Sequence, residues 1–267
     1  MLSPAQQPQS ADSTVSPLRV VTAASLFDGH DAAIHLMRRL IQARGCEVIH
    51  LGHNRSVAEI VRAAVCEDAD AVAISSYQGG HNEFFRYLVD QLAEHGASHI
   101  QVFGGGGGTI TPAEIAELHA YGVNRIYHPD DGMKMGLNDM IDDLVARACK
   151  GREGRVSDCR FPVSGDGLND VEIARALSAI ENGTAPSDQL EPFHSSLRNP
   201  EPGALSPIIG LTATGGAGKS SVTDELLNRF LHYFPERRIA VLAVDPTRRR
   251  TGGALLGDRI RMNSLRS

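Results

Sequence analysis

Residues 210–220 of the chain read GLTATGGAGKS, a glycine-rich turn that ends in Lys219 and Ser220. Successive backbone N–H groups in such a turn, running into the first turn of a helix, form a nest for phosphate oxygens. In this pattern the lysine reaches the β- and γ-phosphates and the serine hydroxyl binds Mg²⁺. Ala213 stands where the usual pattern has its first glycine, and its small side chain permits the turn at negative φ. The stretch therefore predicts a P-loop in an α/β nucleotide-binding fold.

The segments on either side of this turn agree with a P-loop. Residues 205–211 form a short apolar run that predicts a buried strand, and residues 221–231 carry apolar side chains near helical spacing. A second apolar run at 238–246 contains Asp245 near its end, where a parallel sheet delivers side chains to a phosphate site. Asp245 is therefore a candidate for the Mg²⁺ shell.

The P-loop lies close to the C-terminus, and this position predicts that the chain is an N-terminal piece of a longer protein. Asp258 and Arg261 follow a pair of glycines and are candidates for a switch loop. The chain contains no Asn-Lys-x-Asp element, so these residues alone leave GTP and ATP open. A strand–loop–helix–strand fragment buries too little apolar surface to be stable alone. We therefore expect residues 206–267 to be loosely held and to bind nucleotide weakly.

Composition and charge predict a soluble protein with two parts. A length of 267 residues permits one large domain or two ordinary ones, and the formal charge of −6 argues against a nucleic-acid partner. No run of eighteen apolar residues occurs, so no membrane partner is expected. Residues 1–17 are rich in Ser, Pro and Gln without a charged and apolar signal pattern, which predicts a disordered leader and a cytoplasmic location. The four cysteines lack C-x-x-C spacing, so neither a zinc site nor a disulfide framework is implied.

The segment from 18 to 150 alternates apolar strand patterns with amphipathic helix patterns. Strands are expected at 19–24, 47–51, 71–75, 100–103 and 125–128, and helices at 31–44, 57–66, 82–95, 112–121 and 135–149. Five such units predict an α/β fold with a doubly wound five-stranded parallel sheet of the flavodoxin-like kind. Ligands of these sheets bind outside the carboxyl ends of the strands. The loops after the first, third and fourth strands are therefore the candidate site.

Those three loops carry the unusual residues of this segment. After the first strand come Asp28, Gly29 and His30, whose spacing suits a carboxylate that holds one imidazole nitrogen while the other faces a metal. Ser75 and Tyr77 follow the third strand. A run of glycines leaves a wall of backbone without side chains, and ordering such a run costs conformational entropy. The cost is justified where a large ligand must lie close to the backbone, so the run indicates a long planar or ring-bearing group. Such a wall follows the fourth strand as Gly104, Gly105, Gly106, Gly107 and Gly108.

These residues resemble the cobalamin-binding domain of the adenosylcobalamin-dependent mutases and of methionine synthase, whose pattern is Asp-x-His-x-x-Gly, Ser-x-Leu and Gly-Gly. Ala33 replaces the last glycine of the first motif, and Tyr77 replaces the leucine of the second. The resemblance implies that cobalamin binds with its dimethylbenzimidazole base off the cobalt and that His30 is the lower axial ligand. It also implies that Asp28 orients His30, that Ser75 hydrogen-bonds the displaced base, and that the glycine run lines the channel of the nucleotide tail. The two departures would alter how tightly that tail is packed.

The order of the two modules resembles the fused isobutyryl-CoA mutases, in which a G-protein chaperone lies between the cobalamin domain and an acyl-CoA-binding barrel. This resemblance implies a GTPase that gates the loading of adenosylcobalamin and hydrolyses GTP. It implies Mg²⁺ ligands at Ser220, Asp245 and Asp258. The GTP contacts that it implies are Gly215, Gly216, Ala217, Gly218, Lys219, Ser220, Ser221 and Arg261.

The same resemblance bears on activity and partners. The family isomerises isobutyryl-CoA and n-butyryl-CoA, and its barrel is the implied partner of this chain, in a homodimer of the full-length protein. The chain contains no barrel, so it is expected to hold the cofactor without rearranging an acyl-CoA. Beyond Lys219 it offers no catalytic residue.

Residues 151–205 predict a linker between the cobalamin-binding domain at 18–150 and the GTPase segment at 206–267. A helix is expected at 169–181, with Asn169 as its cap and with Ile173, Leu177 and Ile180 on one face. The alternative is a crossover within one larger domain.

Two other functions compete with this interpretation. A five-stranded doubly wound domain with an acid after its first strand also resembles a phospho-acceptor receiver, which would make the chain a signalling module coupled to a P-loop ATPase. That hypothesis requires an acidic pair after the first strand, and only Asp28 is present at the expected place. The second alternative is a stand-alone cobalamin-binding subunit followed by a separate NTPase.

Overall fold

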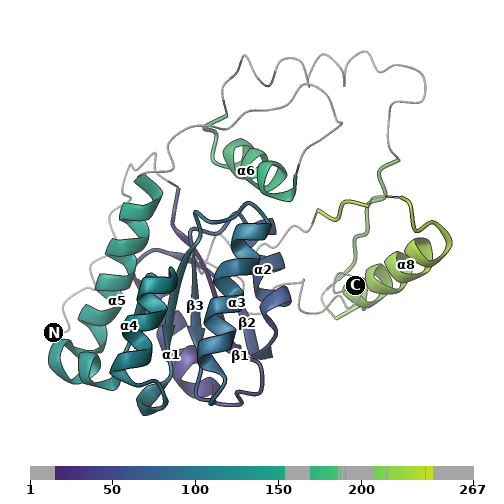
Figure 1. Cartoon of the computed structure of the whole chain (residues 1–267). Coiled ribbons are helices and arrows are strands. Elements are labelled where there is room, and N and C mark those ends of the chain that lie inside the picture. The colour runs from purple at the N-terminus through teal and green to yellow at the C-terminus, as the bar shows by residue number, and fades with distance from the viewer. Residues whose placement is uncertain are drawn as a thin grey trace, which may run out of the picture.

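The computed structural model describes residues 16–153, 169–185, 187, 190, 207–214, 216–237 and 239–242. One parallel sheet, with strand order β2-β1-β3-β4-β5, forms the centre of the N-terminal part (Figure 1). Its strands are β1 Arg19–Ser25, β2 Glu47–Arg55, β3 Ala71–Ser75, β4 Gln101–Gly105 and β5 Arg125–Tyr127. The helices of this part are α1 Asp31–Ala43, α2 Val57–Cys66, α3 His81–Glu94, η1 Gly107–Thr109, α4 Pro112–Tyr121 and α5 Pro129–Glu153. The predicted doubly wound five-stranded sheet is confirmed.

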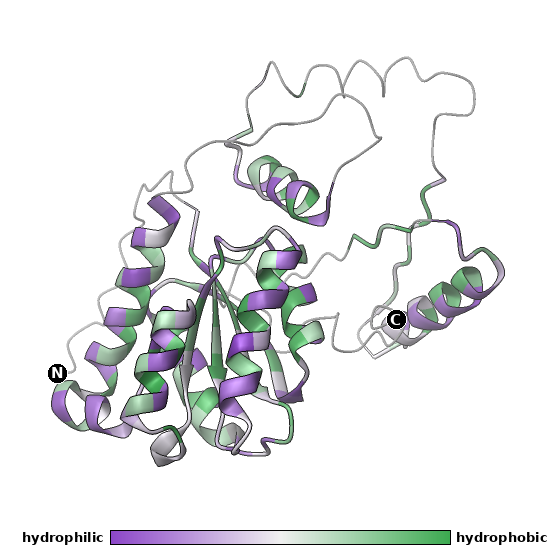
Figure 2. Cartoon of the chain, viewed as in Figure 1, coloured by the Kyte–Doolittle hydropathy of each residue, from purple (hydrophilic) through white to green (hydrophobic). Residues whose placement is uncertain are grey.

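Helices cover both faces of the sheet because each strand alternates its side chains between two cores. One core joins the sheet to α2, α3 and α4 and contains Val21, Ile60 and Phe85. The other joins it to α1 and α5 and contains Ile41 and Phe103. Figure 2 shows the consequence, with apolar colour concentrated on the strands and polar colour on the outward helix faces.

Two elements of the N-terminal part differ from the sequence prediction. Strand β2 continues past residue 51 to Arg55, and its pairing with β1 shifts register twice, with positive φ at Gly52 and Asn54. Helix α5 begins at Pro129 instead of 135 and is interrupted at Gly136, which has φ 80° and ψ 161°. That backbone conformation is essentially restricted to glycine. The interruption separates a first turn, which borders the site, from the long helix that packs on the sheet.

Helix α6 (Asp170–Glu181) forms where the sequence predicted it, and Asn169 and Glu172 make the expected capping box. The expected apolar face was wrong: Leu177 and Ile180 are exposed, and α6 instead buries a set of small residues with one valine. The reason lies at the amino-terminal end of the sheet, where the buried Arg19 guanidinium donates to Ser178 Oγ and to Glu181. Small side chains allow the helix to approach that group closely. The residues buried on α6 are Val171, Ala174, Ser178 and Ala179.

Helix α8 (Lys219–Tyr233) confirms the helix expected after the P-loop. The two strands predicted around it were wrong over the described residues, because 207–211 and 239–242 carry no strand and Ile208 is 96% exposed. A strand needs a neighbour for its backbone hydrogen bonds, and no strand pairs with either segment in the described part of the chain. No helix among the described residues is long and apolar enough to cross a membrane.

Several predicted positions lie outside the described residues. They comprise most of the expected leader, much of the expected linker, and four of the predicted nucleotide or Mg²⁺ contacts, which are Gly215, Asp245, Asp258 and Arg261.

Candidate functional site

The turn after β1 presents an imidazole whose orientation is fixed. The Asp28 side chain is fully buried, and its Oδ1 accepts hydrogen bonds from the backbone N–H of His30 at 2.8 Å and from His30 Nδ1 at 2.9 Å. Because the Nδ1–H group donates a hydrogen bond to the carboxylate, Nε2 carries no proton in the neutral ring and has a free lone pair. The His30 side chain is 73% exposed. The imidazole is therefore held in one orientation at the carboxyl edge of the sheet, where Nε2 is able to bind a metal.

Asp28 also connects this turn to the loop after β3. Its second oxygen, Oδ2, accepts a hydrogen bond from the backbone N–H of Tyr77 at 2.7 Å. The Tyr77 ring lies beside His30, with 5.3 Å between the ring centroids. The structure thus brings together Asp28, His30 and Tyr77, three of the predicted site residues. The buried carboxylate of Asp28 holds the other two in place.

Ser75 ends β3 at the border of a cavity and is buried. Its hydroxyl makes no hydrogen bond to any residue in the described part of the chain, whereas the neighbouring Ser76 accepts one from Ser25 at 3.0 Å. Because Ser75 lines the cavity and its hydroxyl has no protein partner among the described residues, that hydroxyl is available to a ligand in the cavity. Ser75 therefore stands where sequence analysis expected a hydrogen bond to a bound group.

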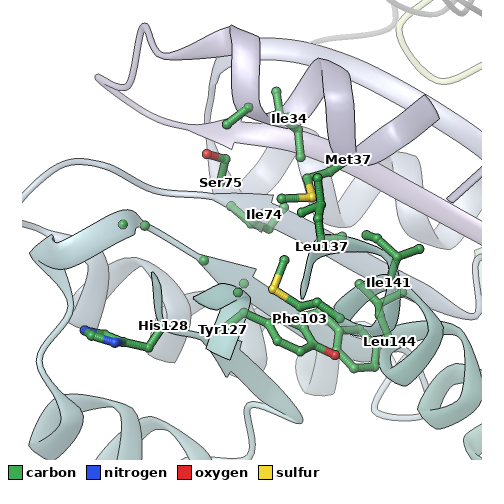
Figure 3. Close-up of a pocket in the computed structure, with 18 of the residues that line it drawn as sticks. Ile34, Met37, Ile74, Ser75, Phe103, Tyr127, His128, Leu137, Ile141 and Leu144 are labelled. Atoms are coloured by element: carbon green, nitrogen blue, oxygen red, sulfur yellow. The ribbon is translucent and has the colours of Figure 1, made fainter. Parts of the chain in front are cut away.

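A cavity of about 270 Å³ opens beside these residues, between the carboxyl ends of β3, β4 and β5 and the helices α1 and α5. In Figure 3 the side chains of α1 and α5 project into the same space as Phe103 from β4. Tyr127 also lines it, and its hydroxyl donates to Asp143 at 2.9 Å. Burial and this hydrogen bond raise the pKa of Tyr127, so the phenol is neutral at pH 7. The apolar side chains of the lining include Ile34, Met37, Leu137, Ile141 and Leu144.

Sequence reasoning missed the contribution of the two helices to this cavity. Ile34, Met37 and Ile41 recur at helical spacing on α1, and Leu137, Ile141 and Leu144 do so on α5. Such a pattern predicts an apolar face and is typical of core packing. These side chains differ from ordinary core residues only because they line the cavity between α1 and α5, which the sequence pattern does not reveal.

The glycine run after β4 has two functions in the structure. A Cβ on Gly106 would lie 1.9 Å from the carbonyl oxygen of Ser76, and one on Gly104 would lie 2.3 Å from Phe85 Cζ. These two glycines are therefore required by the packing of the chain itself. Gly105 differs, because a Cβ added there would lie 3.4 Å from its nearest protein atom, the carbonyl oxygen of Tyr127, which is an ordinary contact. Gly105 lies on the Phe103 face of β4 and lines the cavity. Gly108 has open space around it and is not part of the cavity lining.

The P-loop segment shows part of the expected geometry. Gly216 and Gly218 have φ of 78° and 82°, and α8 begins at Lys219, with Ser220 in its first turn. Lys219 Nζ donates to the carbonyl oxygens of Ala213 at 2.8 Å and of Thr214 at 3.1 Å. The lysine thus folds over its own loop, with its ammonium group beside the glycine-rich turn.

No group of three or more His, Cys, Asp and Glu side chains gathers as a metal site among the described residues. A metal held at His30 would therefore need its remaining ligands from a cofactor, as far as the described residues show. The adjoining cavity, which is mostly apolar and has the Ser75 hydroxyl at its border, suits a flat apolar ring with few polar atoms. The residues present thus fit a large metal-containing cofactor with an aromatic appendage.

Comparison with known proteins agrees with this geometry. Residues 18–133 match the family model for the B12 binding domain, and residues 173–267 match that of the methylmalonyl Co-A mutase-associated GTPase MeaB. The second match begins inside α6, within the segment that sequence analysis treated as a linker.

Individual relatives give the same order of domains. The fused isobutyryl-CoA mutase of Cupriavidus metallidurans is 55% identical over 251 residues, which cover 93% of this chain and 22% of that protein. The protein of the same description from Geobacillus kaustophilus is 52% identical over 94% of this chain and 23% of its own length. The 2-hydroxyisobutanoyl-CoA mutase small subunit of Aquincola tertiaricarbonis is 30% identical over 49% of this chain and 94% of that subunit.

The chain thus spans less than a quarter of the length of these two fused mutases and nearly all of the small subunit. The motifs on the sheet edge, the family matches and the order of the two domains agree with one another. The chain belongs to the acyl-CoA mutase family, in the fused isobutyryl-CoA mutase branch, and carries its B12-binding domain followed by a segment of its MeaB-type GTPase domain.

Proposed function

We propose that residues 18–150 bind adenosylcobalamin in the base-off form, with His30 Nε2 as the lower axial ligand of cobalt. The observation that carries this proposal is the buried Asp28 carboxylate, which holds His30 Nδ1 at 2.9 Å and leaves Nε2 directed outward. When bound, the cofactor supplies the radical chemistry of carbon-skeleton isomerisation.

Each of the neighbouring residues has a separate role in this proposal. Asp28 keeps the proton on Nδ1, which fixes the ring and strengthens Nε2 as a ligand. The backbone N–H of Tyr77 holds Asp28 in turn. The apolar cavity receives the displaced dimethylbenzimidazole base, and Ser75 Oγ donates to a nitrogen of that base. The four glycines of the run that line the cavity, Gly104–Gly107, border the nucleotide tail.

The complete protein is proposed to interconvert isobutyryl-CoA and n-butyryl-CoA, and the names of the fused relatives support the first of these substrates. An acyl-CoA-binding barrel outside this chain is its proposed partner, in a cytoplasmic homodimer. The GTPase segment is proposed to bind GTP with Mg²⁺ and to gate cofactor loading as a chaperone. In that role Gly215–Ser221 and Arg261 contact GTP, with Lys219 at the phosphates. The proposed Mg²⁺ ligands are Ser220, Asp245 and Asp258.

Filling the cavity tests the proposed base-off mode. Gly105→Leu places a branched apolar side chain in the space proposed for the displaced base, and the strand keeps its backbone hydrogen bonds. We expect the dissociation constant for cobalamin to rise by at least about tenfold, because a filled cavity cannot accept the base. Titration followed by visible absorption measures the affinity and distinguishes base-off from base-on cobalamin.

The matched control is Gly108→Leu, in the same glycine run but off the cavity wall, where a side chain meets open space. This variant is expected to bind cobalamin like the parent. Equal affinities of Gly105→Leu and parent, with both spectra base-off, would show that the base does not enter the cavity.

Nucleotide binding by this chain is expected to be weak, with a dissociation constant for Mg²⁺-GTP well above the micromolar range. Ile208 next to the P-loop is 96% exposed, so the sheet that would support the loop is not packed around it in the described residues. Isothermal titration calorimetry of the chain with Mg²⁺-GTP checks this, with Lys219→Ala as the control for P-loop binding. A micromolar affinity that Lys219→Ala removes would contradict the expectation.

The receiver-like alternative is less well supported by the site. A phospho-acceptor aspartate needs an oxygen open to the incoming phosphoryl group. Both oxygens of Asp28 instead accept backbone or imidazole N–H groups, and its side chain is fully buried. The stand-alone cobalamin-binding subunit remains compatible with residues 18–150 and differs from the main proposal only in its partners.

A further inference from the structure

Phe27 adopts a backbone conformation that its residue type disfavours. The backbone N–H of Asp28 donates to the carbonyl oxygen of Ser25 at 3.0 Å, which closes a turn over residues 25–28. Phe27 is the third residue of this turn and has φ of 64°. Turns with positive φ at the third position usually carry glycine or asparagine there, because other side chains are strained in the left-handed region. A bulky aromatic residue at this position is an outlier.

A second residue in an unusual conformation holds Phe27 in place. The side-chain oxygen of Asn54 accepts a hydrogen bond from the backbone N–H of Phe27 at 2.8 Å. Asn54 itself has φ of 55°, a value that asparagine tolerates, and it lies on the extension of β2 that sequence analysis did not predict. The turn of Phe27 is thus held from the neighbouring strand.

The strain is not offset by packing in the described chain. The Phe27 side chain is 83% exposed, although an aromatic ring gains most from burial. Leu26, its neighbour in the turn, packs against the core. The turn is therefore attached to the core through Leu26 and not through the ring of Phe27. Residues that break a local conformational rule without a compensating contact are concentrated at functional sites.

The place of Phe27 in the turn indicates what its ring contacts. Phe27 directly precedes Asp28, the residue that orients His30, and it shares the turn at the carboxyl edge of the sheet. We propose that Phe27 is a cofactor-binding residue whose ring makes an apolar contact with the macrocycle of cobalamin coordinated through His30. This inference rests on the proposed function, and it adds a contact that lies outside the Asp-x-His pattern.

The test uses two substitutions at this position and one elsewhere. Phe27→Gly removes both the ring and the strain, and Phe27→Tyr keeps both. The control is Asp68→Gly, which replaces a residue with φ of 48° at the opposite, amino-terminal end of the sheet. The measurements are the melting temperature without cofactor, the dissociation constant for cob(II)alamin, and the EPR splitting that reports a bound imidazole nitrogen.

Phe27→Gly is expected to melt at or above the temperature of the parent, because glycine adopts positive φ without strain. Its dissociation constant for cob(II)alamin is expected to rise about tenfold, equivalent to the loss of one apolar contact, with the imidazole splitting retained. Phe27→Tyr and Asp68→Gly are expected to bind like the parent.

Three results would overturn the proposal. Phe27→Gly that binds cob(II)alamin like the parent would show that the exposed ring serves another surface, such as the acyl-CoA-binding barrel. A lower melting temperature of Phe27→Gly together with weaker binding would show that the ring is structural. Phe27→Tyr that binds as weakly as Phe27→Gly would show that an aromatic ring is not what matters. Absence of imidazole splitting in the parent is a separate result, because it contradicts the proposed function before the variants are compared.

Discussion

Gly106→Ala is expected to lower the free energy of unfolding by about 3 kcal/mol and to disable the site, because no space exists for a single methyl group. The new Cβ would lie 1.9 Å from the carbonyl oxygen of Ser76, a backbone atom that cannot rotate away. Relief requires the loop after β3 to move relative to β4. That movement would break the hydrogen bond from Ser76 N to Gly105 O and would displace Tyr77 N from Asp28.

Chemical denaturation measures the loss of stability, and Gly108→Ala is the matched control. Gly108 belongs to the same run, but a Cβ added there would meet no atom within 4 Å, and its φ is not in the left-handed region. Gly108→Ala should therefore stay within about 0.5 kcal/mol of the parent. If the two alanine variants were equally stable, the close approach of the two loops would not be a feature of the folded protein.

Asp28→Ala is expected to weaken cobalamin binding about 100-fold, because it removes the group that orients the proposed metal ligand. His30 would lose the acceptor of both its backbone and its Nδ1 hydrogen bond. The partly buried N–H of Tyr77 would lose its partner as well, which costs about 1 kcal/mol of stability. Titration with cob(II)alamin measures the affinity, and thermal or chemical denaturation measures the stability.

The control for this variant is Asp90→Ala, which removes an exposed carboxylate that accepts a hydrogen bond from Tyr121 on the α3 and α4 surface. It also loses a hydrogen bond but lies away from the carboxyl edge of the sheet, so affinity should be unchanged. A parent-like affinity in Asp28→Ala would mean that the orientation of His30 does not depend on the carboxylate.

The fold was predictable where local signals and tertiary packing agree. Strand β3 and helices α2 and α4 occupy the predicted residues, because apolar strand patterns and capping boxes such as that of Thr111 and Glu114 define their ends. The buried face of α6 was not predictable, because apolar spacing favoured Leu177 whereas the Arg19 guanidinium selects the side with Ser178. The strands expected near the P-loop depend on sheet neighbours that local sequence does not supply.

The site was predictable as a set of loops but not as a set of contacts. The rule that parallel strands deliver ligands to their carboxyl ends located Asp28, His30 and Ser75. It gave no means to foresee that Asp28 also holds the backbone of Tyr77, since that bond joins residues 49 positions apart. Nor could the sequence reveal the strained φ of Phe27, because nothing in its neighbours signals a left-handed residue.

The most direct test of the account is the EPR spectrum of cob(II)alamin bound to the chain, compared with that of His30→Ala. The account predicts superhyperfine splitting from a protein imidazole nitrogen in the parent and its disappearance in His30→Ala, which establishes base-off binding with His30 as the cobalt ligand. Cobalamin that stays free or base-on with the parent, or a splitting that persists in His30→Ala, would contradict it.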